Sequence, residues 1–141
     1  MRFYVDTCIW LNLFKKEGDP SKGIPYWNMA QDFLKRTLFS EHQIVYSPII
    51  LRELQIKLEN KDYQKARSYM EGLKLIKIGV GNDDLTIARQ LESQYEFSIS
   101  FYDLIHIALC KKHNLILITR DKKLSEISQA NGVHAFKPEE S

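Results

Sequence analysis

The chain has 141 residues, of which 44% are hydrophobic and 27% are charged, a balance typical of one globular domain with its own core. The formal net charge is only +2, so the overall charge gives little support for binding to nucleic acid. No apolar run approaches the roughly 18 residues of a membrane span, so we expect no membrane contact.

Two features of the sequence bear on the compartment. Asp6 interrupts the first apolar stretch too early for a signal peptide. Cys8 and Cys110 both lie among apolar residues, and neither has a partner at zinc-binding spacing, so we expect buried free thiols. Free thiols are typical of a reducing environment. We therefore expect a cytoplasmic protein.

Short apolar runs alternate with segments of helical spacing along the whole chain. Strands are expected at residues 2–5, 44–46, 75–78, 115–118 and 133–136. Helices are expected at 8–14, 28–38, after Pro48, at 63–70, 82–95, from 101, and at 124–130, with a Gly/Pro loop at 18–25. This alternation predicts an α/β fold with a parallel sheet. We expect one domain, residues 1–136, and a frayed polar tail, 137–141.

The stretch from residue 99 to 124 predicts where a site would lie. Ser100 and Asp103 form an S-x-x-D capping pattern, so a helix should begin near Phe101. Residues 115–118 are apolar at every position, as expected of a strand covered on both faces. Asp121 follows that strand, and open α/β sheets bind ligands at the carboxyl ends of their strands. Asp121 therefore lies at a candidate site.

Three further carboxylates occupy related places. Asp6 follows the first strand, Glu53 lies in the helix after the second, and Asp103 opens the helix before the fourth. Each acid also has a purely structural explanation: Asp6 and Asp121 can be N-caps, Asp103 can complete a capping box, and Glu53 can pair with Lys57 four residues later. Glu53 nevertheless borders the apolar face of its helix, which is unusual for a solvated glutamate.

The four acids together predict a metal site if their side chains converge. Their mutual repulsion would raise some of their pKa values and destabilise the fold unless a cation lay among them. Mg²⁺ or Mn²⁺ suits such an all-oxygen site. A metal held in this way can ionise a water and polarise a phosphoryl oxygen. The hypothesis from the residues alone is a site that cleaves phosphodiester bonds.

Four motifs in register resemble the PIN domain family, in particular its VapC-like toxin ribonucleases. They are Val-Asp-Thr at 5–7, Ser-Pro-Ile-Ile-Leu-Arg-Glu-Leu at 47–54, Tyr-Asp-Leu-Ile-His-Ile-Ala at 102–108 and Ile-Thr-Arg-Asp at 118–121. The resemblance covers residues 1–136 and implies a three-layer α/β/α sandwich whose five-stranded sheet has the order 3-2-1-4-5. It further implies a Mg²⁺- or Mn²⁺-dependent endoribonuclease, a homodimer, and an antitoxin protein that inhibits it.

The resemblance carries the catalytic acids onto Asp6, Glu53, Asp103 and Asp121. On this hypothesis the three aspartates hold the metal, and Glu53 orients a water or completes a second metal position. Thr119 matches the small hydroxyl residue two places before the last acid, and we count it with Arg52, Arg120 and Lys122 among the residues that bind RNA substrate. The chain departs from the family pattern at Cys8, where Ser or Asn is common, and at Lys122-Lys123, where acidic residues are frequent.

Three points stay open in the sequence. Tyr26 and Trp27 could stack on unpaired bases, or pack into the core. His106 lies one turn after Asp103, but its apolar neighbours favour a packed or surface histidine, and we assign it no catalytic role. The alternative for the whole chain is a non-catalytic RNA- or protein-binding module with the same fold, which would have no tight site for a divalent ion.

Overall fold

Five short parallel strands form the centre of the computed structural model, which describes residues 1–18 and 23–141. They are β1 (Arg2–Val5), β2 (Gln43–Tyr46), β3 (Leu75–Lys77), β4 (Ile116–Ile118) and β5 (Ala135–Phe136). Their order in the sheet is β3-β2-β1-β4-β5, which confirms the predicted order. β1 is the middle strand, and Tyr4 on it lies opposite Val45 of β2 and Leu117 of β4.

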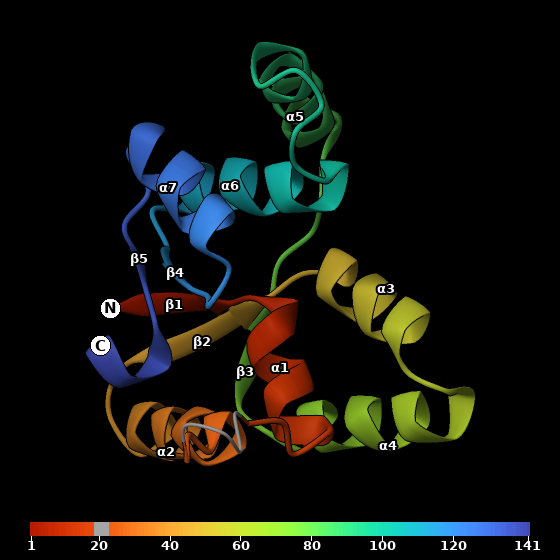
Figure 1. Cartoon of the computed structure of the whole chain (residues 1–141), viewed down its shortest axis with the longest axis vertical. Coiled ribbons are helices and arrows are strands. Elements are labelled where there is room, and N and C mark those ends of the chain that lie inside the picture. Colours follow the sequence, from red (N-terminus) through yellow and green to blue (C-terminus); the bar gives the residue numbers. More distant parts are fainter. Residues whose placement is uncertain (19–22) are drawn as a thin grey trace.

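Helices cover both faces of this sheet, so the predicted three-layer α/β/α arrangement is confirmed. Figure 1 shows α5, α6 and α7 on one side of the sheet and α1, α2 and α4 on the other, with α3 beside α1. The helices are α1 (Thr7–Phe14), α2 (Tyr26–Leu38), α3 (Pro48–Lys57), α4 (Asn60–Glu71), α5 (Asn82–Gln94), α6 (Phe101–His113) and α7 (Lys122–Ala130). None of the helices in the described part of the chain is both long and apolar enough to span a membrane.

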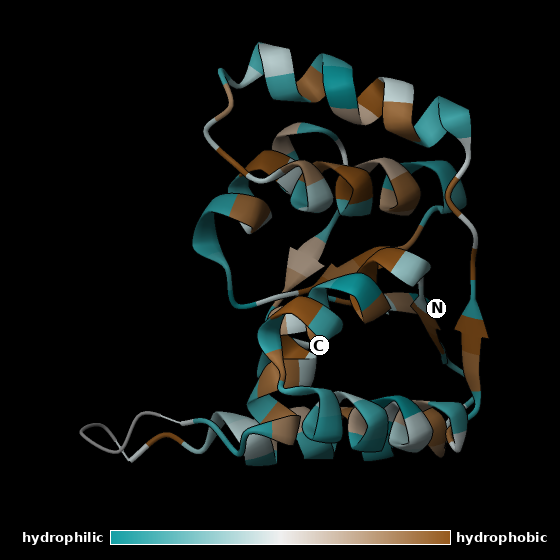
Figure 2. Ribbon diagram, turned by 90° about the vertical axis from the view of Figure 1, so that its right-hand side faces the viewer, coloured by the Kyte–Doolittle hydropathy of each residue, from teal (hydrophilic) through white to brown (hydrophobic). Residues whose placement is uncertain are grey.

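Burial follows the pattern of hydrophobic residues. The strands in the middle of Figure 2 are largely hydrophobic, whereas the outer helices alternate hydrophobic and hydrophilic residues along their length. Helix α6 differs, because every residue from Leu104 to Cys110 is buried. It packs against α5 on its outer side, so no face of its middle turns is left to water.

Four helices begin with a side chain that caps their N-terminus, and these caps determine where the helices start. Asp6 accepts from the Thr7 backbone N–H, Ser47 from that of Ile49, Ser100 from that of Asp103, and Asp121 from that of Leu124. Asp6, Ser47 and Asp121 each come within three residues of the carboxyl end of a strand. The positive ends of these helix dipoles are thus gathered at one edge of the sheet.

The C-terminal segment differs from the prediction. Residues 137–141 were expected to be frayed, but Pro138–Glu140 forms a 3₁₀ helix and Pro138 is buried. The Arg36 guanidinium donates to the backbone oxygens of Ser141 and Pro138, at 3.2 and 3.3 Å. Arg120 also binds the tail, through the Glu139 carboxylate. Both arginines lie outside the sequence around the tail, so no local pattern could indicate these hydrogen bonds.

Smaller differences occur at element ends. The helix expected from residue 28 begins at Tyr26, and the strand expected at 133–136 is limited to Ala135–Phe136. Residues 19–22 of the predicted Gly/Pro loop lie outside the described residues.

Candidate active site

The four acids predicted from the sequence line one cleft of about 460 Å³. Asp6 follows β1, Asp121 follows β4, Asp103 lies in the first turn of α6, and Glu53 lies on α3. β1 and β4 are neighbours in the sheet although their residues are more than 110 positions apart, and this pairing brings Asp6 and Asp121 to the same edge. The other residues that line the cleft are Thr7, Cys8, Leu11, Ile56, Lys57, Ser100 and Tyr102.

Asp6 lies deepest, and both of its carboxylate oxygens are held. Oδ1 accepts from the Thr7 backbone N–H at 2.8 Å, and Oδ2 accepts from the Thr119 hydroxyl at 2.8 Å and the Cys8 thiol at 3.1 Å. Only 4% of the residue is exposed. Burial raises the pKa of Asp6, and the hydrogen bonds from Cys8 and Thr119 partly oppose the rise. Asp6 is therefore the N-cap of α1, but the cap accounts for only one of its carboxylate oxygens, because Thr119 and Cys8 bind the other.

Glu53 contacts residues of α1 and α6 rather than its neighbour Lys57. Its Oε1 accepts from the Thr7 hydroxyl at 2.8 Å and lies 2.5 Å from Nε2 of His106. Both hydrogen bonds fall on the same oxygen. Among residues 1–18 and 23–141, no hydrogen-bond partner is found for Oε2, and Glu53 lines the cleft. Glu53 thus has one fixed oxygen and one that is available to the cleft.

His106 is a part of the site that the sequence analysis missed. Its side chain is fully buried; Nε2 contacts Glu53, and Nδ1 lies 2.6 Å from the Tyr4 hydroxyl. Burial alone lowers the pKa of His106, but the hydrogen bond to Glu53 and the nearby charges of Glu53, Asp6 and Asp103 outweigh it, so the pKa is raised. The available signal was its position three residues after Asp103, because such residues share a helix face.

Asp103 is a partly buried acid among other acids. Its pKa is raised to about 7, first by burial and then by repulsion from Asp6; attraction from His106 opposes the rise, and Glu53 and Asp121 add to it. The capping pattern is also present, but it is the Ser100 hydroxyl that accepts from the Asp103 backbone N–H. The Asp103 side chain is left to the cleft.

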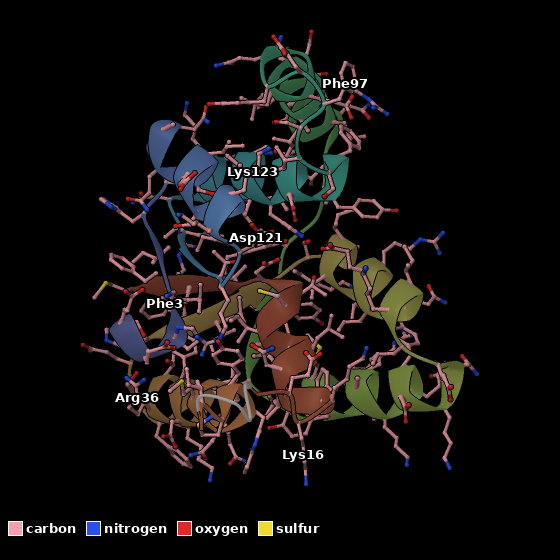
Figure 3. All side chains as sticks on the ribbon, viewed as in Figure 1. Phe3, Lys16, Arg36, Phe97, Asp121 and Lys123 are labelled. Carbon is pink, nitrogen blue, oxygen red and sulfur yellow. The ribbon has the colours of Figure 1, made fainter. Side chains whose placement is uncertain are left out.

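Asp121 is an exposed residue of the cleft lining. Its Oδ1 accepts from the Leu124 backbone N–H at 3.1 Å, and its own N–H donates to the Thr119 hydroxyl at 3.0 Å. In Figure 3, Asp121 lies between the start of α7 and α1, whereas Lys123 lies further along α7. The cap fixes one carboxylate oxygen and leaves the residue exposed to solvent.

The donor set fits a hard divalent cation. One ligand atom each of Asp6, Glu53 and His106 lie within 4.8 Å of one another. The two ring nitrogens of His106 already have partners, so the atoms left to a cation are carboxylate oxygens, as Mg²⁺ and Mn²⁺ prefer. The raised pKa of Asp103 reflects the same excess of negative charge. Lys57 is the one basic side chain lining the cleft in the described part of the chain.

Two of the expected RNA-binding residues prove to be engaged elsewhere. Thr119 is 2% exposed; its hydroxyl donates to Asp6 and accepts from the backbone N–H of Asp121, so it supports these two acids. Both terminal nitrogens of Arg120 donate to the Glu139 carboxylate, and its guanidinium lies 4.2 Å from the ring centroid of Tyr26. Arg120 is thus bound by the C-terminal segment, and it covers one face of the Tyr26 ring.

The remaining basic candidates are exposed outside the cleft lining. Arg52 lies on α3 and donates to Gln55 at 3.4 Å. Lys122 is the first residue of α7, next to Asp121. Neither residue lines the cleft.

Solved structures of bacterial toxin–antitoxin proteins share this fold. VapBC2 of Rickettsia felis, bound to a DNA fragment from its promoter, is 19% identical, with a TM-score of 0.68 over 97% of this chain and 98% of that chain. VapC20 of Mycobacterium tuberculosis, a toxin that cleaves the sarcin-ricin loop, is 17% identical, with a TM-score of 0.69 over 89% and 94%. A toxin–antitoxin complex from Klebsiella pneumoniae is 22% identical, with a TM-score of 0.67 over 96% and 97%.

The sequence comparison gives the family. No curated protein matches the chain. The model of the PIN domain matches residues 3–130, which include all four acids and every strand except β5. Because this match covers most of the chain, the protein belongs to the PIN domain family.

Proposed function

We propose that this protein is a metal-dependent endoribonuclease that acts as the toxin of a toxin–antitoxin pair. The observation that carries the proposal is the convergence of Asp6, Glu53, Asp103 and Asp121 on one cleft at the carboxyl ends of β1 and β4. PIN domains are generally nucleases, and the family match covers every one of these acids. The raised pKa of Asp103 supports a site that needs a cation.

In this proposal Asp6, Asp103 and Asp121 hold Mg²⁺ or Mn²⁺. Bound there, such an ion would polarise a phosphoryl oxygen and make a water more acidic. The chain itself prepares the site: Thr119 and Cys8 fix the Asp6 carboxylate, and the cap on α7 fixes that of Asp121. These contacts hold the negative charge in place before substrate arrives.

Glu53 is proposed to orient the attacking water through Oε2. Its Oε1 is held by Thr7 and His106, so the free oxygen has a defined direction. The water attacks phosphorus in line with the P–O3′ bond and loses a proton to solvent as the new P–O bond forms. The P–O3′ bond breaks, and the leaving O3′ takes up a proton from solvent. The products are one RNA fragment with a 5′-phosphate and one with a 3′-hydroxyl.

Binding of RNA is proposed to involve the basic rim. Lys57 lines the cleft on α3, and Lys122 and Lys123 begin α7 beside Asp121. Phosphate contacts of this kind position a chain without reading its sequence, and they weaken as salt is added. Arg52 is exposed on the same helix, α3, and we include it among the residues that contact a long RNA.

The biological setting is proposed from the solved relatives and the thiols. The structures from R. felis and K. pneumoniae are toxin–antitoxin complexes, so we propose an antitoxin partner and a homodimer for this chain as well. Both cysteines are free, which suits the cytoplasm. Coexpression with the neighbouring gene product tests the partner, and failure of the two proteins to co-purify would count against it.

Cleavage of a fluorogenic single-stranded RNA tests the activity. We expect cleavage with Mn²⁺ or Mg²⁺, none with EDTA, and a rate at least about 100-fold lower for Asp6→Asn. Asp32→Asn on the exposed side of α2 is the matched control and should cleave at the wild-type rate. Mn²⁺ titration by calorimetry is run on the same proteins. Cleavage that survives Asp6→Asn, or a protein with no tight Mn²⁺ site, would indicate a non-catalytic module instead.

A further inference from the structure

We propose that His106 is a positioning residue, which fixes the direction of the Glu53 carboxylate through a chain of three hydrogen bonds from the N-cap of α3, which the helix itself closes into a ring. This inference rests on the proposed function, because it assigns to Glu53 a role in the cleft. The sequence analysis assigned His106 no catalytic role, because its apolar neighbours favoured a packed or surface histidine.

The ring joins three elements through four side chains. The Ser47 hydroxyl lies 2.7 Å from the Tyr4 hydroxyl, which lies 2.6 Å from Nδ1 of His106, and Nε2 of His106 lies 2.5 Å from Oε1 of Glu53. Ser47 caps α3, and Glu53 lies on the same helix six residues later. Tyr4 belongs to β1 and His106 to α6. The ring therefore ties the first turns of α3 to the sheet and to α6.

The direction of the last hydrogen bond follows from Glu53, because a carboxylate can only accept, so Nε2 of His106 carries a hydrogen and donates it. In a neutral imidazole Nδ1 then accepts from the Tyr4 hydroxyl. The Ser47 hydroxyl oxygen accepts from the Ile49 backbone N–H at 3.2 Å, and its own hydrogen can donate to Tyr4. A charged imidazole also carries a hydrogen on Nε2. In both protonation states, His106 donates to Glu53.

Burial makes this ring rigid. Tyr4, Ser47 and His106 are each 0% exposed, so water does not compete for their polar atoms. A buried polar group without a partner costs roughly 1–3 kcal/mol, so each member holds the next in place. At Glu53 the result is that Thr7 and His106 both bind Oε1, and the carboxylate cannot rotate without breaking two hydrogen bonds.

The main alternative is that His106 binds the metal directly. Its Nε2 belongs to the group of ligand atoms within 4.8 Å of one another. That nitrogen is, however, bonded to Glu53, and the side chain is fully covered. Coordination would require His106 to leave both of its partners. The geometry instead places His106 behind Glu53, where its effect passes through the carboxylate.

The test compares His106→Leu, which removes the donor, with His106→Gln, whose amide N–H can still donate to Glu53. His113→Gln at the other end of α6 is the matched control, because His113 is outside the cleft. Three readouts are used: the NMR signal of the His106 Nε2–H proton without metal or RNA, Mn²⁺ affinity by calorimetry, and the kcat and KM for RNA cleavage.

We expect the wild-type Nε2–H proton to resonate far downfield, as in a short hydrogen bond, and this signal to be lost in Glu53→Gln. His106→Leu should lower kcat or Mn²⁺ affinity by about 10–100-fold with little change in the KM for RNA, and His106→Gln should recover most of the loss. Combined with Glu53→Gln, His106→Leu should add almost nothing, because both act through one carboxylate.

Several outcomes would overturn the proposal. They are an unchanged kcat and Mn²⁺ affinity in folded His106→Leu, additive effects in the double variant, or a selective loss of Zn²⁺ or Ni²⁺ binding that identifies His106 as a ligand. If the wild-type protein cleaves no RNA, the proposed function fails, and two measurements decide the role of His106: loss of the Nε2–H signal in Glu53→Gln and a lower Mn²⁺ affinity in His106→Leu support it, and no change in either overturns it.

Discussion

The hydroxyl of Thr119 donates a 2.8 Å hydrogen bond to Oδ2 of Asp6, joining two residues that are 113 positions apart in the chain. The same hydroxyl accepts from the backbone N–H of Asp121 at 3.0 Å. Thr119 follows β4 and Asp6 follows β1, so this side chain fixes one acid and the start of the loop that carries another. The parallel pairing of β1 with β4 makes the contact possible.

Thr119→Val tests this contact because it removes the donor while keeping the shape of the side chain. We expect the free energy of unfolding to fall by about 1–2 kcal/mol, since Oδ2 of Asp6 keeps only the thiol as a donor. Mn²⁺ affinity should fall about tenfold. Thr119→Ser keeps the hydroxyl and is the control. Wild-type stability and affinity in the valine variant would show that the contact contributes nothing.

Raising the pH should destabilise the metal-free protein. The Asp103 carboxyl has a pKa of about 7 in the folded protein against 3.8 for an ordinary aspartate, so between these values the folded chain holds a proton that the unfolded chain has lost. Stability from this group is therefore complete at low pH and is lost as the pH rises through 7, by on the order of 2–4 kcal/mol. The raised pKa values of Asp6 and His106 act in the same direction.

Urea unfolding from pH 5 to 8 measures this effect in wild type and in Asp103→Asn. The asparagine variant should lose less stability over the range, because it has no charge to bury. Saturating Mn²⁺ should remove most of the pH dependence of the wild type. Parallel stability curves for the two proteins would contradict the repulsion that we describe.

The two thiols should react slowly in the folded protein. Burial, and for Cys8 the nearby charge of Asp6, raise the pKa values of Cys8 and Cys110, so the reactive thiolate is scarce at pH 8. We expect Ellman's reagent to modify each at least about tenfold more slowly than after unfolding in guanidinium. Cys110→Ala isolates the signal of Cys8. Rapid reaction of Cys8 in folded protein would show that its thiol is not held on Asp6.

The C-terminal segment should support the site through Arg120, which lies between Thr119 and Asp121. Arg120 binds Glu139 at 2.8 and 2.9 Å and stacks on Tyr26, and its side chain is 13% exposed. Glu139→Gln should lower the free energy of unfolding by about 1 kcal/mol, because Glu139 itself is partly exposed. Glu126→Gln on α7 removes the same charge without touching Arg120 and should have no effect. An unchanged urea midpoint for Glu139→Gln would show that the contact between Arg120 and Glu139 does not stabilise the fold.

Local chemistry determined much of this protein from the sequence alone. The caps at Ser47 and Ser100 are short-range hydrogen bonds, and so the starts of α3 and α6 were predicted correctly. The helices expected from residues 8 and 124 begin earlier, at Thr7 and Lys122, directly after the caps Asp6 and Asp121. The apolar run before Asp121 indicated a covered parallel strand, because a strand buried on both faces needs no polar alternation. The four acids were identified as candidates by their places after strands and in helices.

Tertiary structure alone decided which atoms these acids meet. Glu53 could have paired with Lys57 one turn away, but it contacts His106, which is 53 residues distant, because α3 and α6 pack side by side. Arg120 was expected to hold phosphate, but it holds the tail. A capping hydrogen bond forms between residues within one helical turn, so the local sequence predicts it. The contacts of Glu53 and Arg120 depend instead on which strands and helices lie side by side. The spacing of residues along the chain does not give that arrangement.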